Sequence, residues 1–162
     1  GVMSKTYGLA GLRIGWVASE NDGILSKMAA LKDYTTICNS APAEFLAEIA
    51  LRNRKSIIDR NLGIIRKNLK VLDNFFAHHK KRFEWCKPKA GPIAFPRLMK
   101  EDVREFCKNL VEKENVLLLP GTVFEDTGNH FRIGFGRKNL PEAVSRLEKF
   151  LKSNPKKNAT GF

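Results

Sequence analysis

The sequence is poor in acidic residues and in cysteine, and it has no long apolar run. Only 17 Asp and Glu stand against 29 Lys and Arg, so the formal net charge at pH 7 is +12. The three cysteines, Cys38, Cys86 and Cys107, are odd in number and show neither C-x-x-C spacing nor a histidine partner pattern. We therefore predict reduced thiols, no metal site and a cytoplasmic location. No apolar run reaches the ~18 residues that a bilayer-spanning helix needs, so we predict no membrane segment.

The rest of the composition is that of a folded protein with an excess of positive charge. Hydrophobic residues make up 43% and charged residues 28% of the 162 positions, which is typical of a globular chain. This length suffices for one ordinary domain or for a piece of a larger one. A net charge of +12 by itself favours nucleic acid or another acidic partner. Because the basic residues are spread over helix-like stretches rather than interleaved with aromatics, we interpret them as solvated helical faces.

One short stretch combines a lysine with residues suited to an anionic carbonyl ligand. It contains Ser4, Lys5, Gly8, Gly11 and Arg13, followed by a strand-like run over residues 14–18. A lysine amine forms a Schiff base with a carbonyl when its neutral form is populated. Glycines let the backbone approach a ligand closely, and the arginine fork matches a phosphate. The pattern indicates a carbonyl compound that carries phosphate; the alternative is a surface lysine beside a structural arginine.

The order Ser-Lys-x-x-Gly-Leu-x-Gly-x-Arg-Ile-Gly, which begins at Ser4, resembles the cofactor-attachment motif of class I/II aminotransferases. These are pyridoxal-phosphate (PLP) enzymes of fold type I. The resemblance implies that Lys5 is catalytic and holds pyridoxal 5'-phosphate as a Schiff base, while Ser4 and Arg13 bind its phosphate. It also implies that Arg132, in the strand-like run over residues 130–136, binds the substrate's α-carboxylate. The alternatives are that Arg132 lies on the polar face of an amphipathic strand, or that Arg137 takes this role.

The same resemblance implies an enzyme that transfers an amino group between an α-amino acid and a 2-oxo acid, as a biosynthetic, cytoplasmic homodimer. A PLP-dependent lyase or decarboxylase on this fold, or an inactive basic fragment that binds nucleic acid, remains an alternative. Other residues that such enzymes need, including an aspartate at the pyridine nitrogen, normally precede the lysine by long stretches, and none can be assigned here. We therefore expect a C-terminal portion that starts within the fold, carries no secretory signal and is weak or inactive alone.

Hydrophobic spacing predicts three helices in the first half of the chain. They cover residues 24–31, 43–51 and 55–81. Asn21 and Asp22 can cap the first helix, and Pro42 can start the second. The second is expected to place its apolar residues in a core, namely Phe45, Leu46, Ile49 and Ala50. The third is long enough to join two bodies, so we place a domain boundary within it, near residue 60.

Beyond that boundary, short strands alternate with helices. Strands are predicted at residues 83–86, 93–95, 116–119 and 130–136, and helices at residues 100–113 and 141–151. This order indicates an antiparallel or mixed sheet with helices on one face. The expected fold is α/β. By resemblance, residues 1–60 form the C-terminal end of a fold-type I PLP-transferase large domain, residues 61–152 a small α+β C-terminal domain, and residues 153–162 a polar tail.

Overall fold

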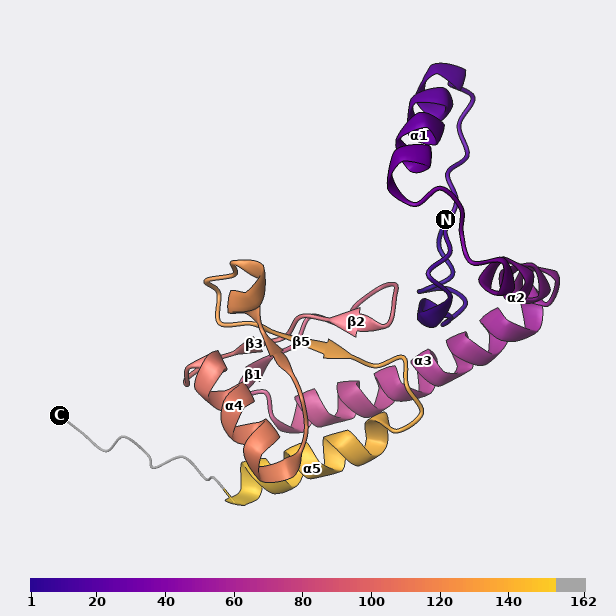
Figure 1. The fold of residues 1–162 in the computed structure, drawn as a ribbon. Coiled ribbons are helices and arrows are strands. Elements are labelled where there is room, and N and C mark those ends of the chain that lie inside the picture. The colour runs from indigo at the N-terminus through magenta and orange to yellow at the C-terminus, as the bar shows by residue number, and fades with distance from the viewer. Residues whose placement is uncertain (154–162) are drawn as a thin grey trace. The chain divides into compact units, whose positions relative to one another are not determined.

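A computed structural model describes residues 1–153, and the chain divides into two compact units, Gly1–Gly63 and Ile64–Phe162 (Figure 1). Each unit has its own hydrophobic core, and helix α3 (Arg54–His78) contributes residues to both. The predicted tail lies outside the described residues, apart from Ser153, which is the last residue of a helix. Among residues 1–153, no helix combines the length and the apolar character needed to cross a bilayer.

The first unit begins with a short antiparallel pairing instead of the predicted strand over residues 14–18. Val2 and Gly15 form an isolated β-bridge, and the Met3 amide donates a hydrogen bond to the Ile14 carbonyl at 3.0 Å. No regular strand forms, because the only backbone that pairs with this segment in the unit is the three-residue stretch at the start of the chain. The strand prediction is therefore wrong beyond this bridge.

Both following helices begin where the sequence predicts. α1 (Asp22–Thr35) starts after Asn21, whose side-chain oxygen accepts a hydrogen bond from the Ile24 amide at 3.0 Å. α2 (Ala41–Arg52) carries Pro42 in its first turn, where a missing N–H costs nothing. These start signals are local, which is why the sequence alone locates them.

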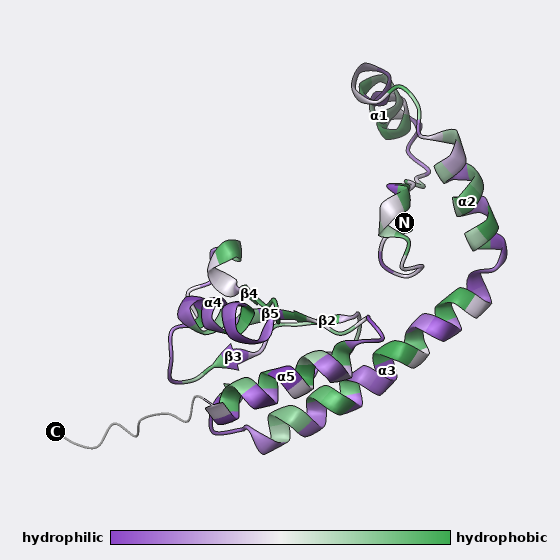
Figure 2. Ribbon diagram, turned by 60° about the horizontal axis from the view of Figure 1, so that its bottom comes forward, coloured by the Kyte–Doolittle hydropathy of each residue, from purple (hydrophilic) through white to green (hydrophobic). Residues whose placement is uncertain are grey.

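The apolar side chains of α1 and α2 are largely exposed, and this corrects the predicted core. Phe45, Leu46 and Ile49 are 64%, 49% and 42% exposed, whereas Ala50 is buried. No residue of α1 is buried, although Figure 2 shows hydrophobic residues along it. The core of the unit consists of Met3, Ala47 and Ala50, with partly buried apolar neighbours. Helix α2 thus buries its alanine face, because small side chains allow close packing on the segment that bears Lys5.

The second unit contains two small antiparallel sheets. β1 (Phe83–Glu84) pairs with β3 (Arg97–Leu98), and the other sheet has the order β2 (Ile93–Ala94), β5 (Phe131–Gly134), β4 (Leu119–Pro120). The strands predicted at residues 83–86, 93–95 and 130–136 are present but shorter. β3 was not predicted, because it is only two residues long and directly follows Pro96.

The run over residues 116–119 was predicted as a buried strand, and only its last residue belongs to β4. Val116 and Leu118 are buried, whereas Leu117 between them is 72% exposed. Such alternation is typical of a strand with one face on the core and one in solvent. One-sided burial follows here because Val116 and Leu118 pack in the core that the helices share. A 3-10 helix, η2 (Gly121–Phe124), follows β4 directly.

Helices α3, α4 (Val103–Glu114) and α5 (Leu140–Ser153) pack on one face of the strands, and Figures 1 and 2 show α5 running alongside the second half of α3. α4 starts at Val103 rather than at residue 100, because the Asp102 carboxylate caps it by accepting two backbone hydrogen bonds. The largest fully buried side chains of this unit include Phe75, Phe76, Phe83, Phe106, Phe131 and Phe135. This aromatic core determines which face of β5 is buried.

One buried polar side chain ties α3 to the segment that follows β5. Asn68 is 2% exposed, and its Nδ2 donates hydrogen bonds to the carbonyls of Phe135 at 2.9 Å and Arg137 at 2.6 Å. Leaving such buried groups unpaired would cost about 1–3 kcal/mol each. Asn68 therefore fixes where the chain leaves β5, the strand that carries Arg132.

The three thiols differ in exposure, which predicts different reactivity. Burial raises the pKa of the Cys107 thiol to about 12, and the Asp102 carboxylate adds to the increase, whereas Cys38 and Cys86 are exposed. Because the thiolate is the reactive form, iodoacetamide at about pH 8 should modify Cys38 and Cys86 and spare Cys107. Peptide mass mapping checks this, with unfolded protein as the control in which all three react. Equal rates for Cys38 and Cys107 in the folded chain would contradict it.

Candidate functional site

Lys5 lies at the start of a tight turn that its neighbours build. The Gly8 amide donates a hydrogen bond to the Lys5 carbonyl at 3.1 Å. Gly8 has a φ of +69°, a left-handed conformation that glycine adopts without steric cost. From α3, Asn61 Nδ2 donates to the Thr6 carbonyl at 3.0 Å. The turn is therefore closed by its own backbone and fixed to a helix, so the base of the lysine side chain is held in place.

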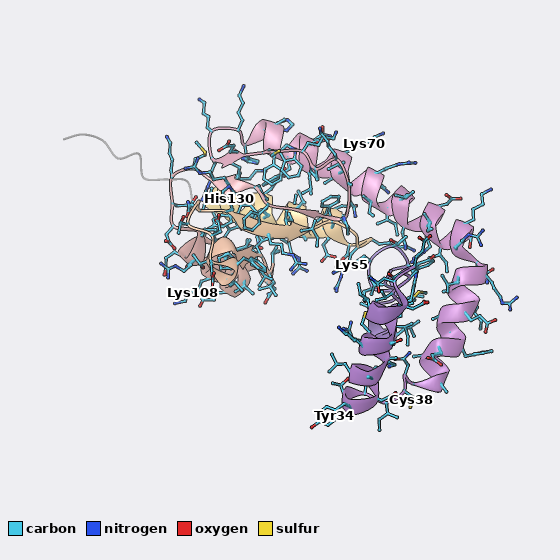
Figure 3. The ribbon with its side chains drawn as sticks, turned by 90° about the horizontal axis from the view of Figure 1, so that it is seen from above. Lys5, Tyr34, Cys38, Lys70, Lys108 and His130 are labelled. Carbon is cyan, nitrogen blue, oxygen red and sulfur yellow. The ribbon has the colours of Figure 1, made fainter. Side chains whose placement is uncertain are left out.

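The functional groups of Ser4, Lys5 and Arg13 are available to a ligand. The Lys5 side chain, labelled in Figure 3, is exposed and Ser4 is half-buried; neither side chain makes a hydrogen bond or ion pair within residues 1–153. The Arg13 guanidinium donates only to the Ala10 carbonyl at 3.2 Å, and no acidic side chain of the described residues pairs with it. One unit thus carries an amine, a hydroxyl and a guanidinium that suit a phosphate-bearing carbonyl compound.

Between these groups the chain forms a 3-10 helix, η1 (Ala10–Leu12), which was not predicted. Arg13 follows η1 with a left-handed backbone, φ 53°. The space beside Gly11 is open, since a side-chain carbon there would meet no atom within 4 Å. Packing within this unit therefore does not explain the glycine at position 11, whereas close approach by a ligand would.

Arg132 lies on β5 in the second unit, on the face opposite the core. Phe131 and Ile133 are buried, and strand alternation places Arg132 on the other side. Its Cζ lies 5.8 Å from the centroid of the Phe124 ring, within cation–π range. Its half-buried guanidinium makes no ion pair or hydrogen bond within residues 1–153, so its N–H groups can donate to a carboxylate. Arg137, the alternative, is exposed and lies beyond the end of β5.

Four residues near Arg132 were not predicted as part of a site, namely Phe95, Phe124, Asp126 and His130. His130, labelled in Figure 3, stacks on Phe95, and its Nδ1 lies 3.0 Å from Asp126 Oδ2. Burial would raise the pKa of the Asp126 carboxyl, but hydrogen bonds from His130 and from the Gly128 backbone outweigh this and hold that pKa below its ordinary value. One signal was available in the sequence, because His130 and Arg132 are two residues apart in a predicted strand and therefore share a face. No pattern marks the other three.

The chain belongs to the class I and II aminotransferases, because the sequence profile of the family "Aminotransferase class I and II" matches residues 1–147. Its mixed helix and strand architecture, shared with solved structures of PLP-dependent enzymes, confirms the predicted α/β fold class.

Three similar proteins show how much of the family's length the chain covers. A crystal structure of a PLP-dependent aminotransferase from Streptococcus suis aligns with a TM-score of 0.86 at 31% identity, covering 96% of this chain and 42% of that one. The PLP-dependent cyclase OrfR aligns with a TM-score of 0.84 at 32% identity, covering 95% of this chain and 42% of its own. Capreomycidine synthase of Streptomyces vinaceus is 31% identical over 93% of this chain and 39% of its own length. The chain thus spans about two fifths of these relatives.

Proposed function

We propose that this chain forms the lysine-bearing and carboxylate-binding part of an aminotransferase that uses pyridoxal 5'-phosphate and transfers an amino group between an α-amino acid and a 2-oxo acid. Membership of the class I and II aminotransferases supports the reaction class. The observation that carries the proposal is the Lys5 amine, which has no partner within residues 1–153 and projects from a turn fixed by Gly8 and Asn61. A structural lysine would instead pair with an acid or a carbonyl.

In this proposal each available group has one task, except Lys5, which has two. Lys5 Nζ would hold the cofactor covalently and, with the substrate amine in its place, would move the proton from the substrate's α-carbon to the cofactor's aldehyde carbon. Ser4 and Arg13 donate hydrogen bonds to the phosphate, and Arg132 binds the α-carboxylate through two parallel N–H groups. When bound, the cofactor supplies an electron sink that weakens the bonds at that carbon.

The wider assignments belong to the same proposal. Residues 1–60 belong to a large cofactor-binding domain and residues 61–152 form a small domain, which the division between Gly63 and Ile64 supports.

Exposed apolar side chains on α1 and α2 support a further subunit or chain segment on this face, and we propose a homodimer. Three free cysteines support a cytoplasmic location, and we also propose a biosynthetic role. Because its available groups suit carbonyl, phosphate and carboxylate, we propose small-molecule ligands rather than nucleic acid.

We also propose that the chain is weak or inactive when it is alone. It spans about two fifths of the length of its relatives. The described residues supply an attachment amine, phosphate donors and a carboxylate partner, but we assign to none of them the acidic partner that the cofactor's ring nitrogen needs to act as an electron sink.

A second reaction on the same scaffold has an observation in its favour. Among the relatives named above, OrfR is a PLP-dependent cyclase at 32% identity, as close as the aminotransferase from Streptococcus suis at 31%. Attachment to Lys5 and carboxylate binding by Arg132 serve cyclisation, elimination or decarboxylation as well as transamination. Product analysis separates these reactions, because only transamination gives a 2-oxo acid together with a new amino acid.

Reductive trapping tests the cofactor assignment on the chain itself. We expect that substoichiometric pyridoxal phosphate followed by borohydride labels a single site, and that peptide mapping locates it on Lys5. The reason is that the Ser4 hydroxyl and the Arg13 guanidinium lie close to Lys5 in the chain and can bind the phosphate.

The matched controls are Lys27→Ala, an exposed lysine of α1, and Lys5→Ala. The first should leave labelling at Lys5 unchanged, and the second should remove the preferred label. Labels spread evenly over many lysines would show that Lys5 is an ordinary surface amine, and the proposed function would lose its basis in this structure.

A further inference from the structure

We propose that Phe124 is a positioning residue that holds the Arg132 guanidinium ready for a carboxylate, and that Phe95, His130 and Asp126 hold Phe124. This rests on the proposed function, in which Arg132 binds the substrate's carboxylate, and adds the residues that make such binding efficient. All five residues lie in the second unit, around β5 and η2.

An arginine side chain is long and flexible, so a carboxylate site needs something to restrict it. For Arg132 that group is the Phe124 ring, 5.8 Å from Cζ, since no acid within residues 1–153 pairs with it. A ring attracts the flat face of a guanidinium, whereas the N–H groups point outward in the guanidinium plane. Phe124 can therefore restrain Arg132 without using the donors that a carboxylate would need. An acidic residue in its place would occupy those donors.

The Phe124 ring is itself held by a sequence of contacts. It packs edge-on against Phe95, with centroids 6.3 Å apart and an interplanar angle of 75°. Phe95 also stacks nearly parallel on His130, with centroids 5.1 Å apart. Asp126 Oδ2 accepts hydrogen bonds from His130, from Nδ1 at 3.0 Å and from the backbone amide at 3.3 Å. A continuous series of contacts therefore links the Asp126 carboxylate to the Arg132 guanidinium through His130, Phe95 and Phe124.

Gly121 shows how closely these groups are packed. A side-chain carbon at Gly121 would lie 2.6 Å from Asp126 Oδ2, 2.9 Å from the His130 carbonyl and 3.0 Å from Phe95 Cζ. Three members of the cluster thus converge on Gly121, a position that has no side chain. Because Gly121 is also the first residue of η2, and Phe124 the last, the same short helix makes room for the cluster and supplies its ring.

Arginine side-chain NMR of the 162-residue chain tests the proposal, with pyruvate as the carboxylate probe. The Nε–Hε signal of Arg132 reports both side-chain order and binding. In Phe124→Leu we expect the Arg132 order parameter to fall and the pyruvate Kd to rise about two- to fivefold, the range that one cation–π contact gives. Phe124→Tyr keeps a ring and should restore both values. Phe95→Leu should change both in the same direction by less, and the exposed neighbour Val123 gives the control Val123→Ala, which should change neither.

A purely structural role for Phe124 predicts a lower melting temperature with Arg132 order and pyruvate affinity unchanged. If a folded Phe124→Leu chain keeps both Arg132 order and pyruvate affinity, the proposal is overturned. If Phe124→Leu does not fold, unchanged Arg132 order and pyruvate affinity in Phe95→Leu overturn it instead. Arg132→Gln separates the proposal from the proposed function. If it leaves the pyruvate affinity unchanged, Arg132 is not the carboxylate site and that part of the function fails. The order parameter of Arg132 in Phe124→Leu still decides whether the ring positions it.

Discussion

Replacing Lys5 by alanine is expected to lower the rate of amino-group transfer by about two to four orders of magnitude, the range that one positioned acid–base group contributes. In the proposed function, Lys5 is the residue whose amine attaches the cofactor and afterwards moves the proton from the α-carbon. Alanine leaves the backbone of the turn intact, because the bonds that close it come from Gly8 and Asn61. The loss should therefore appear in kcat rather than in folding.

The measurement needs the part of the enzyme that this chain does not span. Residues 1–153 can be grafted in place of the matching 42% of the Streptococcus suis aminotransferase, with which they align at a TM-score of 0.86. Formation of a 2-oxo acid from a panel of α-amino acids then reports activity. Lys27→Ala on exposed α1 is the matched control and should retain the rate. A Lys5→Ala graft within tenfold of its parent would contradict the catalytic role.

The sequence predicted the helices well because their signals are local. The side chain of Asn21 caps α1, Pro42 lies in the first turn of α2, and the apolar period of α3 continues past Gly63 as expected. A cap or a period involves residues within one or two turns of each other, so no tertiary information is needed. Helix ends were less accurate, as at Asp102, where one capping side chain decides the first turn.

Burial and strand pairing could not be predicted in the same way. The period of α2 shows which residues share a face, but Phe45 is exposed, whereas Ala47 packs in the small core. What covers an apolar face depends on segments far away in the sequence or outside the chain. Likewise, β3 exists because its two residues pair with segments distant in the sequence, among them β1, and nothing local marks residues 97 and 98 as a strand.

The candidate site residues of the first unit and those of the second differ in the same respect. Lys5 and Arg13 could be selected from the sequence, because the motif that connects them is continuous. The surroundings of Arg132 could not, since Phe95 lies in a segment distant in sequence from Phe124 and Asp126, and they meet through ring contacts and one hydrogen-bonded histidine. A strand pattern indicates the side on which Arg132 lies, but not what faces it there.

Removing the Phe83 ring should cost the second unit about 3–5 kcal/mol of unfolding free energy, the usual loss for a buried phenylalanine cut back to alanine. Phe83 is 2% exposed and lies between α3, α4 and β5. Its ring centroid is 5.6–5.9 Å from the rings of Phe75, Phe76, Phe106 and Phe131. Since whole domains are stable by about 5–15 kcal/mol, this single change could remove most of the unit's stability.

Urea unfolding followed by Trp85 fluorescence measures this loss, because Trp85 stacks on Phe76 with centroids 4.4 Å apart and so reports on the same core. The other tryptophan, Trp16, belongs to the first unit, so both variants are compared in a Trp16→Phe background. Leu117→Ala is the matched control, because Leu117 is 72% exposed in the same unit and should change the unfolding free energy by less than about 0.5 kcal/mol. Equal losses for Phe83→Ala and Leu117→Ala would mean that the aromatic cluster does not hold this unit together. The inner face of β5 would then have no rigid support, and neither would the position of Arg132 on its outer face.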